Sequence, residues 1–166
     1  MLKLPKDVVS DPRHEAVAKL LEGGAKPLWE NGRVDAPHLV STPALGAILR
    51  ESLAAGQAVQ GLELIADKLA AEQRGLDALK EKVPESPQNA RASRILFIAN
   101  DGSTRFYRDA DALLMRYERR LLACRLDLAG EALGEAIFGQ PRIVRAVLVI
   151  DKKLAARTLF ALLPAG

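Results

Sequence analysis

The chain has 166 residues, of which 49% are hydrophobic, 27% charged and only 4% aromatic, which suits one domain with a mainly aliphatic core. A single cysteine excludes an intrachain disulfide framework, and no apolar run approaches the roughly 18 residues of a membrane span. The net charge of +3 is too small to identify a polyanionic partner.

The distribution of charge is more informative than its sum. Residues 1–90 carry 11 Lys and Arg against 13 Asp and Glu, whereas residues 91–166 carry 13 against 8. Eleven of those thirteen cations are arginines, whose guanidinium groups bind phosphate bidentately and stack on bases. The second part of the chain therefore favours a polyanionic partner, with an ordinary solvated surface as the alternative.

The N-terminal residues and the absence of a long apolar run favour a cytoplasmic protein without a membrane partner. Residues 1–5 lack the apolar core of a signal peptide. Cys124 lies in an apolar run, which predicts a small buried hydrophobic side chain rather than a reactive thiol.

Residues 1–41 are expected to form a short helical and hairpin arm. Asp11-Pro12 is typical of a helix start, and Gly23-Gly24 of its end. Asn31-Gly32 is typical of a two-residue hairpin turn. Trp29, next to this turn, is expected to anchor the arm on the core.

Residues 42–93 are expected to contain two helices, an edge strand and a loop. One helix starts at Thr42-Pro43, residues 57–60 fit a short edge strand, and Gly61 opens a longer helix. Apolar residues in near-heptad spacing run along that helix: Leu62, Ile65, Leu69, Leu76, Leu79 and Val83. Two partners are open for its far half: a second chain, by self-association through the Leu62–Val83 stripe, or the N-terminal arm. Gly75 is a point where this helix could break or kink. Residues 72–93 are expected to form an extended helix end and a loop.

Residues 94–151 predict an α/β sheet. Apolar runs of strand length at 95–99, 121–126 and 143–150 alternate with helical patterns at 105–120 and 129–138, and a last helix follows residue 151. The run at 95–99 is apolar at every position, which indicates a strand covered on both faces.

No catalytic motif is recognisable. The chain lacks a phosphate-binding glycine loop, a nucleophile elbow, a Ser/His/Asp set and a zinc pattern, so we expect no catalytic residues, no cofactor and no metal site. Asn100, Asp101 and Ser103 follow a buried strand, at the edge where α/β proteins bind ligands. An enzyme using these three residues is the alternative to simple helix capping by Asp101 or Ser103.

The order of several short motifs resembles a known family. A helix ends in Ala-Gly-Gln at 55–57, and Val-Gln-Gly at 59–61 opens the next helix. Three motifs follow in order: Leu-Phe-Ile-Ala-Asn-Asp at 96–101, Glu-Ala-Leu-Gly-Glu-Ala at 131–136, and Arg-Ala-Val-Leu-Val-Ile-Asp at 145–151. Over about residues 42–163 this resembles the kink-turn RNA-binding superfamily of archaeal ribosomal protein seven-Ae and eukaryotic protein thirty, and most closely its bacterial YlxQ-like members.

The resemblance implies a three-layer α/β/α sandwich with a small mixed sheet, and a non-catalytic RNA-binding or ribosome-associated function. Family members hold RNA with the glycine that opens the second helix and with the loop after the Leu-Gly helix. With the arginines of the basic part of the chain, the nucleic-acid-binding residues are then expected to be Gln60, Gly61, Glu63, Arg94, Arg105, Arg108, Gln140, Arg142 and Arg145.

Two departures from the family pattern change the expected contact. Glu63 and Leu64 stand where kink-turn binders carry Asn-Glu, and Asp67 stands where a Lys is expected. Because Glu63 brings negative charge towards phosphates, a looser RNA contact through arginines is favoured over strict kink-turn recognition. The alternative function is a protein-interaction or structural module that kept the fold and lost RNA binding.

Overall fold

A six-stranded mixed sheet forms the centre of the molecule. The computed structural model describes residues 4–83 and 91–164, and these contain seven helices and six strands. The sheet order is β1-β2-β5-β4-β6-β3, with β2, β5 and β4 parallel and the other neighbours antiparallel. The strands are β1 Ala25–Pro27, β2 Asp35–Leu39, β3 Ala58–Gln60, β4 Arg94–Ile98, β5 Leu121–Leu126 and β6 Ala146–Val149.

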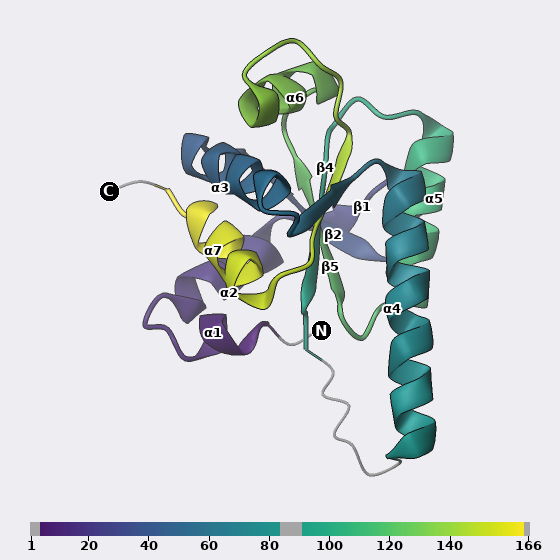
Figure 1. The fold of residues 1–166 in the computed structure, drawn as a ribbon. Helices are drawn as coiled ribbons and strands as arrows, with labels where there is room; N and C mark the ends of the chain where they lie inside the picture. The colour runs from purple at the N-terminus through teal and green to yellow at the C-terminus, as the bar shows by residue number, and fades with distance from the viewer. Residues whose placement is uncertain (1–3, 84–90, 165–166) are drawn as a thin grey trace.

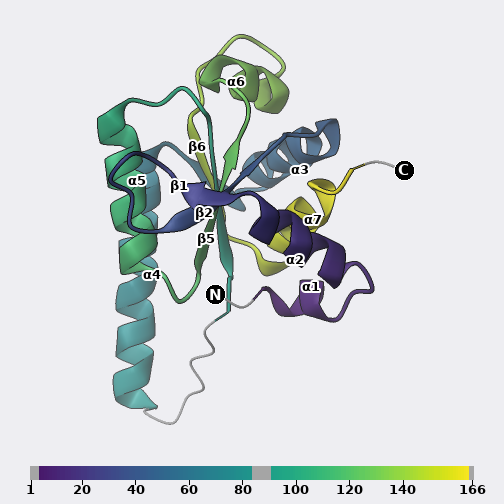
Figure 2. The same cartoon turned by 180° about the vertical axis from the view of Figure 1, so that it is seen from behind.

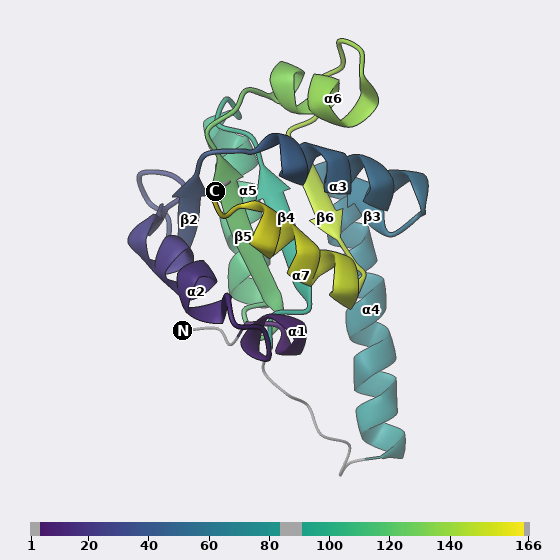
Figure 3. The ribbon, with the colours of Figure 1, turned by 90° about the vertical axis from the view of Figure 1, so that its left-hand side faces the viewer.

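Helices cover both faces of this sheet, which confirms the expected three-layer α/β/α sandwich (Figure 1, Figure 2). α4 (Leu62–Lys82) and α5 (Thr104–Arg116) lie on one face. The other face carries α1 (Lys6–Val9), α2 (His14–Gly23), α3 (Pro43–Ala54) and α7 (Lys152–Ala161), which lie across the strands in Figure 3. α6 (Gly130–Phe138) packs against α3 at one end of the sheet.

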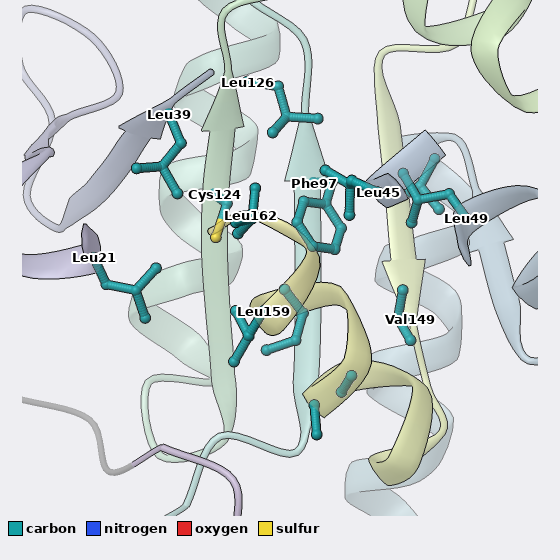
Figure 4. Packing of buried hydrophobic residues seen from close by; sticks show 14 of the residues in the cluster. Leu21, Leu39, Leu45, Leu49, Phe97, Cys124, Leu126, Val149, Leu159 and Leu162 are labelled. Atoms are coloured by element: carbon teal, nitrogen blue, oxygen red, sulfur yellow. The ribbon is translucent and has the colours of Figure 1, made fainter. Parts of the chain in front are cut away.

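β4 is buried on both faces because its side chains alternate between two apolar clusters. Ile95 and Phe97 belong to the cluster under α3 and α7, whereas Leu96 and Ile98 belong to the cluster under α4 and α5. All four side chains are fully buried. Figure 4 shows Phe97 of β4 among side chains from neighbouring strands and from α7. The sequence-based prediction of a strand covered on both sides is confirmed.

The N-terminal segment adds two strands to the sheet. β1 and β2 pair antiparallel, but their last pair is Pro27 with Asp35, so a seven-residue connection replaces the expected two-residue turn at Asn31-Gly32. β2 then runs parallel to β5 through two of its residues. Residues 25–39 therefore extend the central sheet, and the segment is more than an arm packed beside it.

The connection between β1 and β2 is held by one buried acid of α5. Asp111 is 1% exposed and accepts hydrogen bonds from the backbone N–H groups of Arg33 (3.0 Å) and Val34 (3.2 Å). Its second oxygen pairs with the Arg33 guanidinium at 3.3 Å. Trp29 packs against the cluster under α4 and α5, as its expected anchoring role requires.

Local sequence signals place several boundaries correctly. The Thr42 hydroxyl accepts from Leu45 N–H at 3.1 Å and caps α3, and residues 58–60 form the expected edge strand. α4 runs to Lys82 without interruption at Gly75. α1 was not expected, and α5 ends at Arg116 rather than at residue 120. Most of the predicted loop at 83–93, namely residues 84–90, lies outside the described residues.

Candidate nucleic-acid interface

Most of the predicted site residues gather where the parallel strands end. There β2, β5 and β4 finish and α4, α5 and α6 begin, at the top of Figure 1. We call this region, formed by residues 60–63, 100–108, 127–130 and 139–145, the carboxyl edge. Three helix N-termini therefore present backbone N–H groups at one end of the sheet.

Gly61 joins the edge strand β3 to the first turn of α4. Its φ of 88° lies in the left-handed region, which residues with a side chain adopt only with strain. Its N–H donates to the carbonyl oxygen of Ala146 at 2.9 Å, so the start of α4 lies beside the start of β6. Gln60 pairs with Val147 in the ladder, and Glu63 is exposed in the first turn of α4.

The loop after α6 folds back along its own helix. A Cβ on Gly134 would overlap the carbonyl oxygen of Arg142, and one on Gly130 would lie 2.8 Å from Cγ of Arg145. Val144 N–H also donates to Gly130 carbonyl at 3.0 Å. The sequence predicts that this strand starts at residue 143, but β6 starts at Ala146. The contact of residues 142–145 with α6 explains the difference. It also explains the Leu-Gly pair of the motif, because only glycine permits this approach.

Arg142 and Gln140 are exposed in that loop. The guanidinium of Arg142 lies 4.3 Å from the ring centroid of Phe138, the last residue of α6. Stacking on an aromatic ring limits the side-chain freedom of the arginine while its donors stay in solvent. Among the predicted residues, Arg142 is therefore the best prepared for a phosphate contact.

Arg145 is partly neutralised by Asp101. The Asp101 carboxylate accepts from Gly130 N–H at 2.9 Å and from Arg145 Nε at 3.3 Å. The hydrogen bond from Gly130, with Arg145 beside it, lowers the pKa of Asp101 below its ordinary value. Since the Arg145 side chain is 40% exposed, it keeps donors directed to solvent while Asp101 fixes its position.

Arg105 and Arg108 project from the first turns of α5. Ser103 caps this helix by accepting from Phe106 N–H at 3.1 Å. The two arginine side chains are 83% and 60% exposed, and both contact Asp109 only at 3.8–4.0 Å. Ion pairs this open contribute little stability, so both guanidinium groups remain accessible to another anion.

Arg94 does not lie with the other predicted residues. It starts β4, at the opposite end of the sheet, and its side chain is only 16% exposed. Its guanidinium binds Glu72 of α4 at 2.9 Å, and Arg120 binds the other oxygen of Glu72 at 3.2 Å. The RNA-binding hypothesis predicts that Arg94, Arg105, Arg108, Arg142 and Arg145 form one contiguous positive patch. This prediction is wrong for Arg94, because the direction of β4 places residue 94 at the far end of the sheet.

A polar network beneath the carboxyl edge was not predicted. The Tyr107 hydroxyl donates to Ala99 carbonyl at 2.7 Å and accepts from Gly102 N–H at 3.0 Å. The Arg125 guanidinium lies 4.8 Å from the Tyr107 ring and donates to the carbonyl of Asn100 at 3.3 Å. Arg125 is 18 positions from Tyr107 and 25 positions from Asn100 in the sequence. No local sequence pattern therefore connects β4, α5 and β5 in this way.

The three residues of the enzymatic alternative all carry structural hydrogen bonds. Asn100 Nδ2 donates to Asp127 at 3.0 Å, Asp101 caps α6 and Ser103 caps α5. Ser103 thus caps the next helix along the chain, as expected, while Asp101 caps the one after it.

Over residues 4–83 and 91–164, three or more His, Cys, Asp or Glu side chains nowhere gather as a metal site. Over the same residues, every helix is too short or too polar to cross a membrane. Cys124 is fully buried, which raises the pKa of its thiol to about 12, so its prediction as a buried hydrophobic residue is confirmed.

No family model matches the chain, and no curated protein matches its sequence.

Proposed function

We propose that the protein is a non-catalytic RNA-binding module, associated with the ribosome or with another structured RNA, and that RNA contacts the carboxyl edge. The hydrogen bond from Gly61 N–H to the Ala146 carbonyl carries the proposal. It places the N-terminus of α4 beside the first residue of β6, where the loop after α6 ends. This N-terminus and this loop are the two segments to which the family resemblance assigns RNA contact. A helix N-terminus next to a basic loop suits phosphates and base edges.

Four of the predicted arginines support this proposal. Arg105, Arg108, Arg142 and Arg145 all belong to the carboxyl edge. Guanidinium groups bind phosphate oxygens through paired donors, and RNA with unstacked bases adds surfaces on which they stack. The hydrogen bonds of Tyr107 and Arg125 hold residues 99–102, the segment that leads into α5 with Arg105 and Arg108.

The carboxylates at the same edge define how RNA is expected to bind. Glu63 is exposed in the first turn of α4 and repels phosphate there. The negative charge of Asp101 is partly neutralised by its ion pair with Arg145. RNA is therefore expected to approach from the side of Arg142 and of the first turns of α5, with Gly61 at the margin of the contact.

A filter-binding titration with total structured RNA tests the proposal. Arg142→Ala is expected to weaken binding about tenfold and to reduce the salt slope of log K by about 0.7–0.9, because one phosphate contact is lost. Arg157→Ala is the matched control, since Arg157 lies on α7, is 50% exposed and pairs with Glu51. An equal loss of affinity in both variants would contradict a specific contact at the carboxyl edge. An affinity that does not change with salt between about 50 and 200 mM would contradict phosphate contacts there.

A second candidate function is self-association through α4. Leu79 and Val83, at the far end of its apolar stripe, are 44% and 46% exposed. Two copies that paired these stripes would bury both residues. Sedimentation that shows a monomer at high protein concentration, unchanged in Leu79→Glu, would remove this candidate.

A further inference from the structure

A second cationic feature lies at the opposite end of the sheet from the carboxyl edge. A cavity of about 710 Å³ opens there between the far half of α4, the segment around α1, the starts of β4 and β5, and the start of α7. We call it the basal cavity. Its volume falls within the range of 300–1,000 Å³ that is common for small-molecule sites.

Basic side chains dominate the wall of the basal cavity. Among the described residues, seven Lys or Arg side chains line it, against two acids, Asp7 and Asp77. Asp77 already accepts a hydrogen bond from Gln73 at 3.0 Å. Glu72, behind the wall, is a third carboxylate, and it is used by Arg94 and Arg120. An excess of positive charge therefore remains in the cavity, although the whole chain has a net charge of only +3.

The two arginines tied to Glu72 are held in fixed positions. Arg94 binds both oxygens of Glu72 through Nε and Nη2, and its Nη1 donates to the Ser93 carbonyl at 2.8 Å. Arg120 uses only Nη2 on Glu72, and its buried Nε has no hydrogen-bond partner among the described residues. Arg120 therefore lines the cavity with hydrogen-bonding capacity that Glu72 does not use.

The start of α7 adds one cation to the wall. Lys152, the first residue of α7, lines the cavity. Asp151 already caps this helix by accepting from Leu154 N–H at 2.9 Å. The group that an anion in the cavity would contact here is therefore the Lys152 ammonium and not the helix N-terminus.

Part of the wall of the basal cavity is apolar. Leu76 and Leu79 of α4 line it, next to Gln73, Asp77 and Lys80 of the same helix. A bare inorganic anion leaves such a wall exposed to water, whereas a nucleoside covers it.

We propose that the basal cavity binds a phosphate ester of nucleotide size, with its phosphates on Arg119, Arg120 and Lys152 and its nucleoside against Leu76 and Leu79. The phosphate ester is supplied either by a free nucleotide or by one unit of an RNA strand, since both carry the same chemical groups. This site does not depend on RNA binding at the carboxyl edge.

Backbone amide chemical shifts in NMR titrations of the full chain test the site. ATP without metal and a ten-nucleotide single-stranded RNA are the two probes. Saturable shifts of the amides of residues 91–94, 119–121 and 152–154 are expected, with ATP leaving residues 139–145 unmoved. Shifts with ATP identify a free nucleotide as a ligand, and shifts with RNA alone identify the strand as the source. If neither probe moves the amides of the cavity at millimolar concentration, the proposal is wrong.

A pair of neighbouring lysines supplies the matched control. The double variant Arg119→Ala/Lys152→Ala is expected to lose at least about tenfold in affinity for the probe that binds, since two charge-assisted contacts disappear. Lys153→Ala removes one positive charge next to Lys152, at a position that does not line the cavity. Unchanged affinity in Lys153→Ala supports a built site. An equal loss per charge in both variants would overturn it in favour of diffuse attraction. Because Arg142 is untouched, this result is independent of the test at the carboxyl edge.

Discussion

The Asp101 carboxylate lies 2.9 Å from the backbone nitrogen of Gly130, so a residue that follows β4 caps the first turn of α6. The same oxygen accepts from Arg145 Nε at 3.3 Å. One short side chain therefore connects the end of β4, the start of α6 and the approach to β6. These are the segments that hold the carboxyl edge together.

Replacing Asp101 by alanine is expected to destabilise the protein by about 1 kcal/mol, which is the usual cost of losing a helix cap. Arg145 contributes little to this figure because the pair is more than one third exposed. Urea denaturation followed by circular dichroism measures the change. Asp109→Ala, which removes only long exposed contacts to Arg105 and Arg108, is the control and should stay within about 0.5 kcal/mol of the original protein. Equal stability of Asp101→Ala and Asp109→Ala would show that the cap is not energetically important.

Features encoded by neighbouring residues were predicted from the sequence. The all-apolar run of β4 indicated a strand buried on both faces, and Thr42 indicated the start of α3. In both cases the signal and the structure lie within one element, where propensity and capping act.

Features that depend on distant residues were not predictable in this way. Arg33 and Asp111 are 78 positions apart, and Glu72 and Arg94 are 22 apart. The pairing of β2 with β5, which brings the N-terminal segment into the sheet, involves residues 38–39 and 125–126. Sequence alone gave no strand direction, so Arg94 was grouped with arginines that the fold places at the other end. The same lack of direction hid the basal cavity.

Asp111 is expected to be the residue on which the N-terminal connection most depends. Asp111→Ala leaves the N–H groups of Arg33 and Val34 without their acceptor and empties a buried position, so we expect a loss of about 2–3 kcal/mol. Trp29, the only tryptophan, lies in the same connection and its fluorescence provides the measurement. A red shift of its emission at low urea concentration, before global unfolding, is the expected signature. An unchanged spectrum and midpoint would mean that apolar packing alone holds this segment.

Glu72 makes stability depend on pH. Although burial alone would raise it, the hydrogen bonds and charges of Arg94 and Arg120 hold the pKa of Glu72 below its ordinary value. A carboxyl group with a lowered pKa in the folded state stabilises the fold above its ordinary pKa of about 4.3, and loses this contribution as pH falls through the folded-state value. We therefore expect Glu72→Gln to be less stable than the original protein by about 1–2 kcal/mol at pH 7, where two half-buried arginines lose their counterion. Urea denaturation between pH 3 and pH 7 should show the two proteins converging on the acid side. A difference that stays constant over this range would exclude the charge of Glu72 as the cause.

Two glycines in helices provide a matched pair of substitutions with opposite expected outcomes. Gly134 faces the Arg142 carbonyl, with no space for a Cβ, whereas nothing lies within 4 Å of a Cβ at Gly75 on α4. Gly134→Ala is expected to lower stability by more than 1 kcal/mol and to displace the loop after α6, since backbone cannot yield as a flexible side chain does. Gly75→Ala is expected to raise stability by about 0.5–1 kcal/mol, because alanine favours the helix.

Denaturation midpoints of the two alanine variants test the packing, and RNA titration of the same proteins tests its consequence for the carboxyl edge. Gly134→Ala should weaken RNA binding through displaced Arg142, measured at a temperature where the variant is folded. Gly75 lies far along α4, on the other side of the sheet, so Gly75→Ala should bind RNA with the affinity of the original protein. If Gly134→Ala bound RNA with full affinity while its loop had moved, the loop after α6 would not be part of the contact.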